Sequence, residues 1–581
     1  MSSAARPDEP ATLGPAEQSE DDDPGSPSPA APAAARPVNS KFEVVRAVGI
    51  LPDRLGTMAA QDAPFGESAQ DSTGLRICVV GAAATGGETL RQLVTRALAT
   101  PGIAVEIIVF DDCPDTDLGV GPAWRELPGG LHEKLLVNMW LPTIAIRRGH
   151  DGEIARHIQA KAAVDPGPFP PRAMAGCFLR ERFIETLRIA SGSNATVRRV
   201  RARASSLLMQ ADGKPAVDAG GVVYPCEAVV LALGNVPSTS YRHFDGLSGY
   251  VANPWAFERW LATVERSASV LVAGTSVTAV DSVIALIENG HQGPVVMFSQ
   301  GGGLPGARPL HTPAELRLVR EDTVDAIAAS YFGGGFNGED DLATLIGLEF
   351  SAQGIPLRRL IEVFEQSRRT NVDWLSYTLS RSEEKSLVFG VQKALDDVIP
   401  AIWNACRPEA KRTLAGKLGN FARVQWPMAP QNARRILAYM KSGQLIVRGG
   451  MGQPFSDGEH FTVPFNDGTT ACGDVFINAT GIGGHLDNFD CPLVRAMRRR
   501  GLLVPHPLWG ALADFDTGRL LNSFGQPVGP IWSVASALTR GIRLLTNELS
   551  AATRSAVRAA DSAFDYALES FAHRSTGALD R

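Results

Sequence analysis

The stretch LRICVVGAAATGGETLRQLV, from Leu75 to Val94, constrains the fold more than any other part of the chain. Its apolar beginning is typical of a buried strand, and its second half carries apolar residues at helical spacing. A glycine-rich turn joins the two, which is typical of a dinucleotide-binding domain. The segment IAVEIIVFDD, Ile103 to Asp112, follows a Thr-Pro-Gly break and predicts a second buried strand. Together they predict a βαβ unit in a parallel sheet.

A dinucleotide-binding turn needs small residues at three positions, for the tight turn, for the approach to the pyrophosphate and for close packing of helix on strand. Gly81, Ala83 and Gly86 occupy these positions. Alanine at the second position adds a methyl group near the path of the phosphates, so this turn alone also suits an ordinary α/β protein. Asp111 closes the second strand, where a carboxylate can accept hydrogen bonds from ribose hydroxyls.

A second strand-turn-helix pattern, SVLVAGTSVTAVDSVIALIENG, runs from Ser269 to Gly290. Its three small positions hold Gly274, Ser276 and Ala279, a more degraded version of the motif. Two further buried strands end in small residues, VVLALGN with Gly234 and FINATGIG with Gly481. Small residues at such strand ends let a ligand or another backbone come close. Two such units in one chain are stronger evidence of dinucleotide binding than either unit alone.

The length and charge of the chain limit the number of domains and the kinds of partner that are expected. The chain has 581 residues, enough for several domains, and its 44% hydrophobic and 20% charged residues are ordinary for globular proteins. The net charge of −6 lies largely in the first forty residues, so no basic surface for nucleic acid or an anionic membrane is expected. Residues 1–40 are rich in Pro, Ala, Ser and acidic residues, which predicts a disordered tail.

Cysteine and histidine usage narrows the function further. The seven cysteines contain no C-x-x-C pair, which predicts a reduced, cytoplasmic protein and disfavours a disulfide reductase. No apolar run is long enough for a membrane span, and no secretory signal is visible. The ten histidines show no metal-ligand spacing, so no metal site is expected.

Seven stretches carry a family resemblance: VVGAAATGG, LGVGPAW, LLVNMWLP, VVLALGNVP, VLVAGTSVTAVD, VFINATGIG and ALTRG. The chain resembles FAD/NAD(P)-binding oxidoreductases with two dinucleotide-binding domains, most of all a bacterial subgroup related to flavin-dependent N-hydroxylating monooxygenases. The resemblance implies an α/β fold with two Rossmann-like domains, an FAD domain split around an NAD(P) domain, and a helical insertion. The expected segments are a tail (1–40), the first FAD part (74–248), the NAD(P) core (249–310), the helical elaboration (311–445), the FAD return (446–550) and a C-terminal helix and tail (551–581).

The resemblance also implies cofactor-binding residues. Those implied for FAD are Gly81, Ala83, Gly86, Gly87, Asp111, Gly119, Gly121, Leu136, Val137, Asn138, Gly234, Gly481, Leu538, Thr539, Arg540 and Gly541, and those for the nicotinamide nucleotide are Gly274, Ser276 and Ala279. The family often has an arginine after the strand that ends here in FSQGGG. Gln300 is uncharged and cannot pair with a 2′-phosphate, so either Arg308 substitutes for that arginine or the NADPH preference is lost.

The implied function is an FAD-dependent oxidoreductase that takes hydride from NAD(P)H and uses dioxygen to oxygenate a small molecule, such as an amine or amino acid. One alternative is an FAD-dependent oxidase or reductase without oxygen insertion, and another is a non-catalytic nucleotide-binding protein. The family's His/Arg-bearing stretch is replaced here by RVQWPMAP, Arg423 to Pro430, so the substrate stays open. Catalytic residues and oligomeric state are not assigned, since the cofactor performs the redox step in such enzymes.

Overall fold

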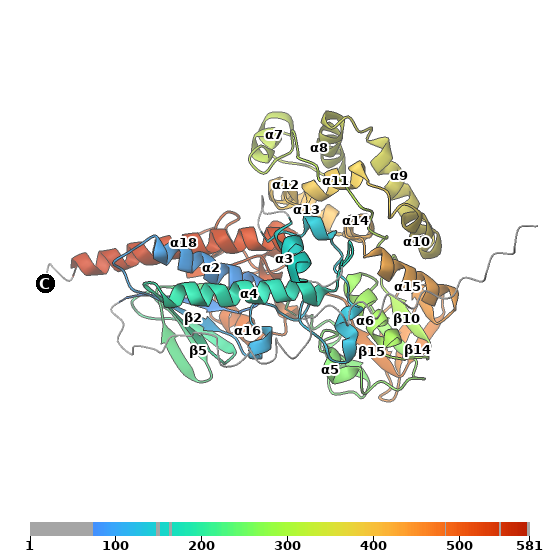
Figure 1. Ribbon diagram of the computed structural model, residues 1–581, viewed down its shortest axis with the longest axis horizontal. Coiled ribbons are helices and arrows are strands. Elements are labelled where there is room, and N and C mark those ends of the chain that lie inside the picture. Colours follow the sequence, from blue (N-terminus) through green and yellow to red (C-terminus); the bar gives the residue numbers. More distant parts are fainter. Residues whose placement is uncertain are drawn as a thin grey trace, which may run out of the picture.

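The computed structural model describes residues 74–146, 152–161, 165–236, 238–482, 484–544 and 548–577. Two α/β bodies lie side by side, and a group of helices sits above them (Figure 1). The predicted disordered tail, residues 1–40, lies outside the described residues. None of the described helices is long and apolar enough to cross a membrane.

The first body is built on a six-stranded sheet in the order β16-β17-β7-β1-β2-β3. All neighbouring pairs are parallel except β16 with β17. The strands are β1 (Leu75–Val80), β2 (Val105–Phe110), β3 (Ala195–Val200), β7 (Ala228–Leu231), β16 (Arg519–Leu521) and β17 (Pro527–Ser533). The central strands β1, β2 and β7 are almost wholly apolar because layers cover both faces of the sheet.

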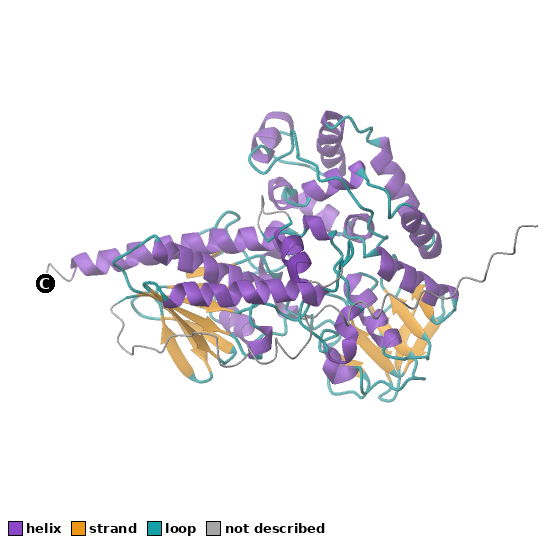
Figure 2. Ribbon diagram, viewed as in Figure 1, coloured by secondary structure: helices purple, strands orange, loops and turns teal. Residues whose placement is uncertain are grey.

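Helices cover one face of this sheet and a small antiparallel sheet covers the other (Figure 2). The helices are α2 (Ala84–Leu98), α4 (Arg172–Ser191) and α18 (Leu549–Gly577), with the short α3 (Glu153–Lys161) beside α4. On the other face lie α16 (Pro492–Arg499) and the three-stranded meander β4 (Ala204–Met209), β5 (Pro215–Ala219) and β6 (Val222–Pro225).

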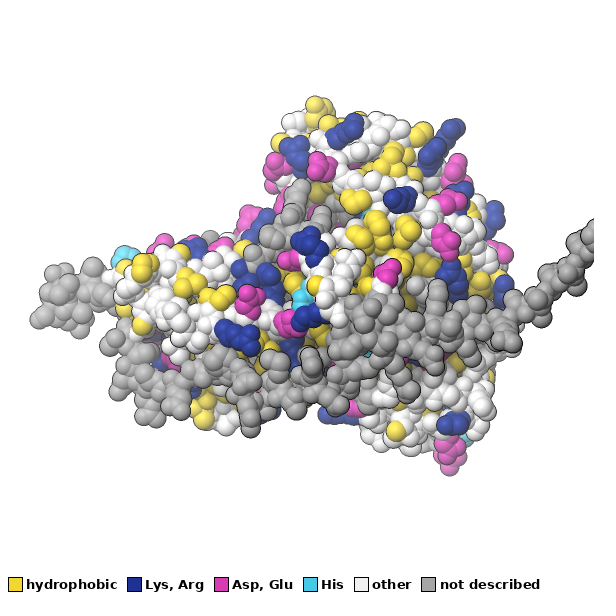
Figure 3. Space-filling view, in the orientation of Figure 1, with side chains coloured by type: hydrophobic (Ala, Val, Ile, Leu, Met, Phe, Trp, Pro, Cys, Tyr) yellow, Lys and Arg dark blue, Asp and Glu magenta, His cyan; other side chains and the backbone are white. Residues whose placement is uncertain are grey.

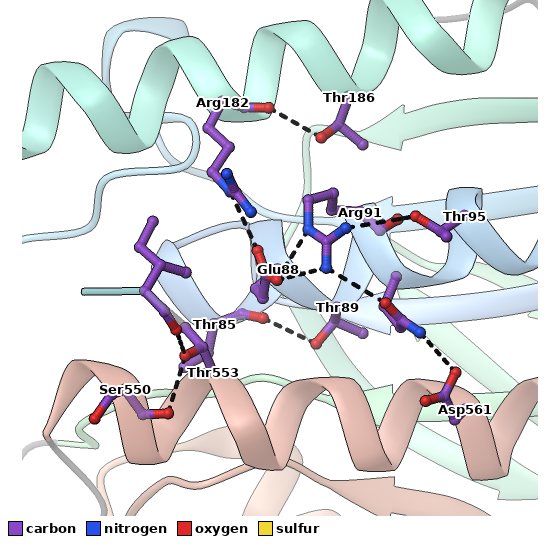
Figure 4. A network of polar contacts seen from close by, with 12 residues as sticks. Thr85, Glu88, Thr89, Arg91, Thr95, Arg182, Thr186, Ser550, Thr553 and Asp561 are labelled. Atoms are coloured by element: carbon purple, nitrogen blue, oxygen red, sulfur yellow. Dashed lines mark hydrogen bonds and ion pairs between the residues drawn. The ribbon is translucent and has the colours of Figure 1, made fainter. Parts of the chain in front are cut away.

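Polar contacts tie the three helices to one another (Figure 4). Glu88 of α2 is buried and pairs with Arg91 at 2.7 Å and with Arg182 of α4 at 3.4 Å. Gln92 donates to Asp561 of α18 at 2.8 Å. A buried carboxylate needs such partners, because leaving one unpaired is costly. The network therefore links α2 to α4 and to α18.

The second body is a five-stranded parallel sheet in the order β11-β10-β9-β15-β8. Its strands are β8 (Tyr250–Val251), β9 (Val270–Ala273), β10 (Val295–Phe298), β11 (Leu445–Arg448) and β15 (Val475–Asn478). Its helices are α5 (Phe257–Trp260), α6 (Val277–Glu288) and α15 (Pro430–Lys441), and its meander is β12 (Phe455–Ser456), β13 (Phe461–Pro464) and β14 (Thr470–Gly473). Residues of α6 and α15 share one apolar core with the sheet.

The helical insertion has an apolar core of its own. Its helices are α7 (Val324–Tyr331), α8 (Glu339–Ala352), α9 (Arg358–Ser367), α10 (Asn371–Ser380), α11 (Leu387–Leu395), α12 (Ile399–Ala405), α13 (Pro408–Ala415) and α14 (Leu418–Gln425). Basic and acidic side chains are interspersed over its visible face (Figure 3). Trp374 of α10 is buried, and α10 packs against α15 of the second body, so the insertion is anchored there.

The predicted fold class is confirmed: two Rossmann-like bodies carry a helical insertion, and the first is split around the second. The sheets divide the chain differently from the expected segments, however. Residues 446–550 were expected to return to the first body, yet β11 and β15 lie in the second sheet. The chain returns to the first sheet only at β16 and β17, which ends at Ser533. Strand pairing between distant segments decides both boundaries, and local patterns do not report it.

Candidate dinucleotide sites

The turn after β1 fits the tight geometry of a dinucleotide cradle. Gly81 has φ +105°, a conformation that L side chains rarely adopt, and a Cβ there would collide with the carbonyl oxygen of Ala232. Its N–H donates to the carbonyl of Phe110 at 2.9 Å. A Cβ at Gly86 would collide with the carbonyl oxygen of Gly81. Both glycines are therefore needed for α2 to lie this close to β1.

Ala83 is accommodated by a glycine from another segment. Gly121 has φ +83°, and a Cβ there would lie 2.9 Å from the Cβ of Ala83. Gly119 fixes this loop, because its N–H donates to the carbonyl of Ala82 at 2.8 Å. Gly87 packs next to Phe183, whose ring carbon would lie 3.1 Å from an added Cβ. The methyl group at the second small position thus occupies room that Gly121 leaves open.

Asp111 follows β2 and lies next to this turn. Its carboxylate accepts hydrogen bonds from the N–H of Ala82 at 2.6 Å and of Cys113 at 2.8 Å. The start of α2 has no side-chain cap and no acidic residue in its first turn. Backbone N–H groups there suit a pyrophosphate, and a carboxylate at the end of β2 suits a ribose. The residues present therefore fit the ADP portion of FAD.

The turn after β9 repeats the same construction. The N–H of Gly274 donates to the carbonyl of Phe298 at 2.8 Å, and its φ is +122°. A Cβ there would collide with the carbonyl oxygen of Ala479. Ser276 is exposed just before α6, and its side chain does not cap the helix. Ala279 is fully buried in α6, where a small residue allows close packing. This geometry fits a second dinucleotide despite the single glycine.

The two strand-end glycines belong to different bodies. Gly234 follows β7, which pairs with β1, and Gly481 follows β15, which pairs with β9. Their φ values are +62° and +85°, and an added Cβ at either would meet no atom within 4 Å. Gly234 accepts a hydrogen bond from the N–H of Ala537 at 3.3 Å. Each glycine therefore follows a strand of a different sheet, and whether either touches a cofactor stays a prediction.

The remaining predicted residues differ in what they offer a ligand. Thr539 is fully buried, and its hydroxyl accepts from the N–H of Ser536 within the 3₁₀ turn Ala537–Thr539, so it is already engaged. Arg540 begins α17 (Arg540–Arg543), and its guanidinium lies 4.8 Å from the ring centroid of Trp509. Asn138 is half-buried, and its side chain has no hydrogen bond to any described residue. Whether these three residues touch a cofactor stays a prediction.

Sequence patterns did not reveal Arg172, which joins the two bodies. It lies at the start of α4, and its Nη1 is 2.7 Å from the carboxylate of Asp281 on α6. Its Nε donates to the carbonyl of Leu136 at 3.0 Å, in the loop expected beside the flavin ring. Its guanidinium also lies 5.6 Å from the ring of Trp255. Burial raises the pKa of Asp281, and Arg172 opposes that rise.

His311 gives the structure a measurable acid sensitivity. It lies beside Trp140 and is 1% exposed, and burial together with the charges of Arg308 and Lys393 lowers its pKa to about 4. The unfolded chain therefore binds this proton at higher pH than the folded chain. Because of this proton, the free energy of unfolding should fall by about 2–3 kcal/mol between pH 7 and 4.5. We expect His311→Gln to abolish that part of the fall, measured by chemical unfolding at both pH values. The exposed His243→Gln is the control, and an unchanged pH dependence in His311→Gln would contradict the assignment.

The chain is similar in part to known proteins. Residues 78–236 match a family model described as FAD-NAD(P)-binding. No curated protein matches the chain in sequence. Among solved structures, an ornithine hydroxylase from Pseudomonas aeruginosa is 12% identical, with a TM-score of 0.49 over 85% of this chain and 99% of that one. An L-lysine 6-monooxygenase from Pseudomonas syringae is also 12% identical, with a TM-score of 0.47 over 85% and 99%.

Residues 78–236 of the first body, which contain the first turn, Asp111 and Gly234, therefore match an FAD/NAD(P)-binding domain. This confirms the resemblance to FAD/NAD(P)-binding proteins that the sequence suggested. The match ends before β9, so the second body is assigned from its sheet order and from the turn at Gly274.

Proposed function

We propose that the chain is an FAD-dependent oxidoreductase that uses NAD(P)H and dioxygen to hydroxylate a small molecule, with an amine as the preferred class. The observation that carries the proposal is the pair of like-built turns at Gly81 and Gly274, one in each parallel sheet. FAD bound in the first body would accept a hydride from NAD(P)H and pass the electrons to an acceptor. The sequence resemblance to N-hydroxylating enzymes supports the oxygen-inserting step.

The chain's own residues would hold and orient these groups. The N–H groups at the start of α2 would bind the pyrophosphate of FAD, and Asp111 would bind its ribose. Asn138 and the loop from Leu136 would flank the flavin ring, held in place by Arg172. The helical insertion contacts both bodies, through α10 against α15 and α12 against α17, and would help to exclude water, which such chemistry requires.

An absorbance spectrum of the purified chain, followed by anaerobic titration with NADPH and NADH, tests the proposal. We expect a yellow protein whose flavin band bleaches on addition of one coenzyme, because both turns are built for dinucleotides. On re-exposure to air with candidate amines, the hydroxylated product should match the coenzyme consumed. A protein that stays colourless after incubation with FAD would refute the proposal.

The same experiment separates the alternative, an oxidase or reductase without oxygen insertion. The motivating observation is the second turn, where Ser276 replaces the middle glycine. In that case all consumed coenzyme would appear as hydrogen peroxide or as a reduced second acceptor, whichever amine is supplied. Product formation that depends on the amine, with little peroxide, would exclude it.

A further inference from the structure

The ends of β2 and β10 are equivalent in position but differ in charge. The N–H groups of Gly81 and Gly274 both donate to the last residue of the neighbouring strand, Phe110 and Phe298 respectively. The next residue is Asp111 in the first body and Ser299 in the second. In Rossmann folds an acidic side chain here binds the ribose 2′-hydroxyl of NAD, whereas NADP needs room and positive charge for its 2′-phosphate.

Ser299 is built into the second turn in the place of that carboxylate. Its Oγ lies 2.9 Å from Oγ1 of Thr275, the residue after Gly274, and accepts a hydrogen bond from the N–H of Gly302 at 2.9 Å. In the first body the Asp111 carboxylate likewise bonds to Ala82, the residue after Gly81. Ser299 is thus hydrogen-bonded to its turn as Asp111 is, but it carries no charge.

An arginine from the helical insertion lies against the same loop. Asn371 of α10 donates to the carbonyl of Gly302 at 2.8 Å, and it accepts from Nη2 of Arg423 on α14 at 3.0 Å. Nε of Arg423 donates to the carbonyl of Leu304 at 3.2 Å. A Cβ on Gly303 would lie 2.6 Å from that same Nε. The guanidinium therefore borders the loop that leaves β10.

The guanidinium of Arg423 can still donate hydrogen bonds to a ligand. It is half-buried, its Nη1 has no hydrogen bond to a described residue, and no described carboxylate forms an ion pair with it. Its burial lowers its pKa, but an arginine stays charged near neutral pH. A half-buried cation without a counterion favours an anionic ligand.

Gln300 and Arg308 do not serve this role. The amide of Gln300 donates to the carbonyl of Met451 at 2.9 Å and carries no charge. Arg308 is 2% exposed and packs with its guanidinium 5.0 Å from the ring of Phe389. Arg308 is therefore sealed inside the protein, and the suggestion that it substitutes for the strand-end arginine is wrong.

We propose that Ser299 and Arg423 make the second site selective for NADPH over NADH. Ser299 leaves the ribose position without negative charge, and Nη1 of Arg423 pairs with the 2′-phosphate. The inference rests on the proposed function, since it requires a nicotinamide dinucleotide in the second body.

Calorimetric titration of the FAD-loaded full chain with NADP⁺ and with NAD⁺ tests this inference without turnover. We expect NADP⁺ to bind at least about tenfold more tightly than NAD⁺, a difference of about 1.4 kcal/mol. Arg423→Gln should abolish that preference by weakening NADP⁺ alone. Ser299→Asp should invert it, because the new carboxylate repels the 2′-phosphate and accepts from a 2′-hydroxyl. Arg448→Gln is the matched control, since Arg448 lies at the end of β11 and already pairs with Asp467 at 2.6 Å.

The outcomes are separable. Equal affinities in the parent chain, or an affinity ratio that neither variant changes, would overturn the NADPH assignment and leave the proposed function standing. Failure of both coenzymes to bind a chain that holds FAD would overturn the proposed function together with this inference. If Arg423→Gln does not fold, Ser299→Asp decides alone, because Ser299 is partly exposed.

Discussion

Replacing Gly86 with valine is expected to empty the first dinucleotide site. A Cβ at this position would collide with the carbonyl oxygen of Gly81, a backbone atom that cannot rotate away. The helix α2 must then move off β1, which displaces the N–H groups that would bind the pyrophosphate. We expect FAD affinity to fall about 100-fold or more, equivalent to about 3 kcal/mol, measured as the flavin-to-protein ratio after dialysis.

Ala83→Gly is the matched control within the same turn. It removes the methyl group that faces Gly121 and restores the usual second glycine, so FAD occupancy should stay the same or rise. Circular dichroism of the Gly86→Val chain separates loss of the site from loss of the fold. A folded Gly86→Val chain that still holds stoichiometric flavin would contradict the placement of FAD in this turn.

Asp281→Ala is expected to be the most destabilising single change at the junction of the two bodies. It leaves the Arg172 guanidinium buried without its ion-pair partner, 2.7 Å away in the parent chain. Removing one member of a buried pair typically costs about 3–5 kcal/mol. The midpoint of guanidinium-induced unfolding, followed by tryptophan fluorescence, should fall accordingly.

The control is the surface pair of Arg448 and Asp467, whose carboxylate is 58% exposed. Asp467→Ala should cost less than about 1 kcal/mol, because solvent screens such pairs. Equal effects of the two substitutions would show that the Arg172–Asp281 pair contributes no more than a surface contact. Since Arg172 also holds the carbonyl of Leu136, Asp281→Ala should in addition alter the flavin absorbance spectrum.

Features of local origin were predictable from the sequence. A run of apolar residues, a small-residue turn and a helical period lie within about twenty residues of one another, so both βαβ units could be located. The turn at Gly81 was correctly placed between β1 and α2, and Asp111 at the end of β2. A helical insertion was likewise expected over residues 311–445, and α9 lies within that range.

Features that depend on pairing between distant segments were not predictable. In the first sheet β3 pairs with β2 and β17 pairs with β7, yet the residues of β3 and β17 do not indicate which strands they pair with. The same holds for Arg172 and Asp281, which meet only once both bodies have formed. Arg423 stood in a stretch that departs from the family pattern, but its place beside Gly303 follows from the packing of α14 and not from spacing.

The strand order also determines when each of the two bodies can finish folding during translation. The second sheet has all its strands once β15 has left the ribosome, whereas the first still lacks β17 and the covering helix α18. Residues of α18 belong to the same apolar core as β1 and α2, so this core stays open until the last segment is translated. Under the proposed function, the FAD site would therefore be completed after the coenzyme site, and chains that end before β17 would not retain FAD.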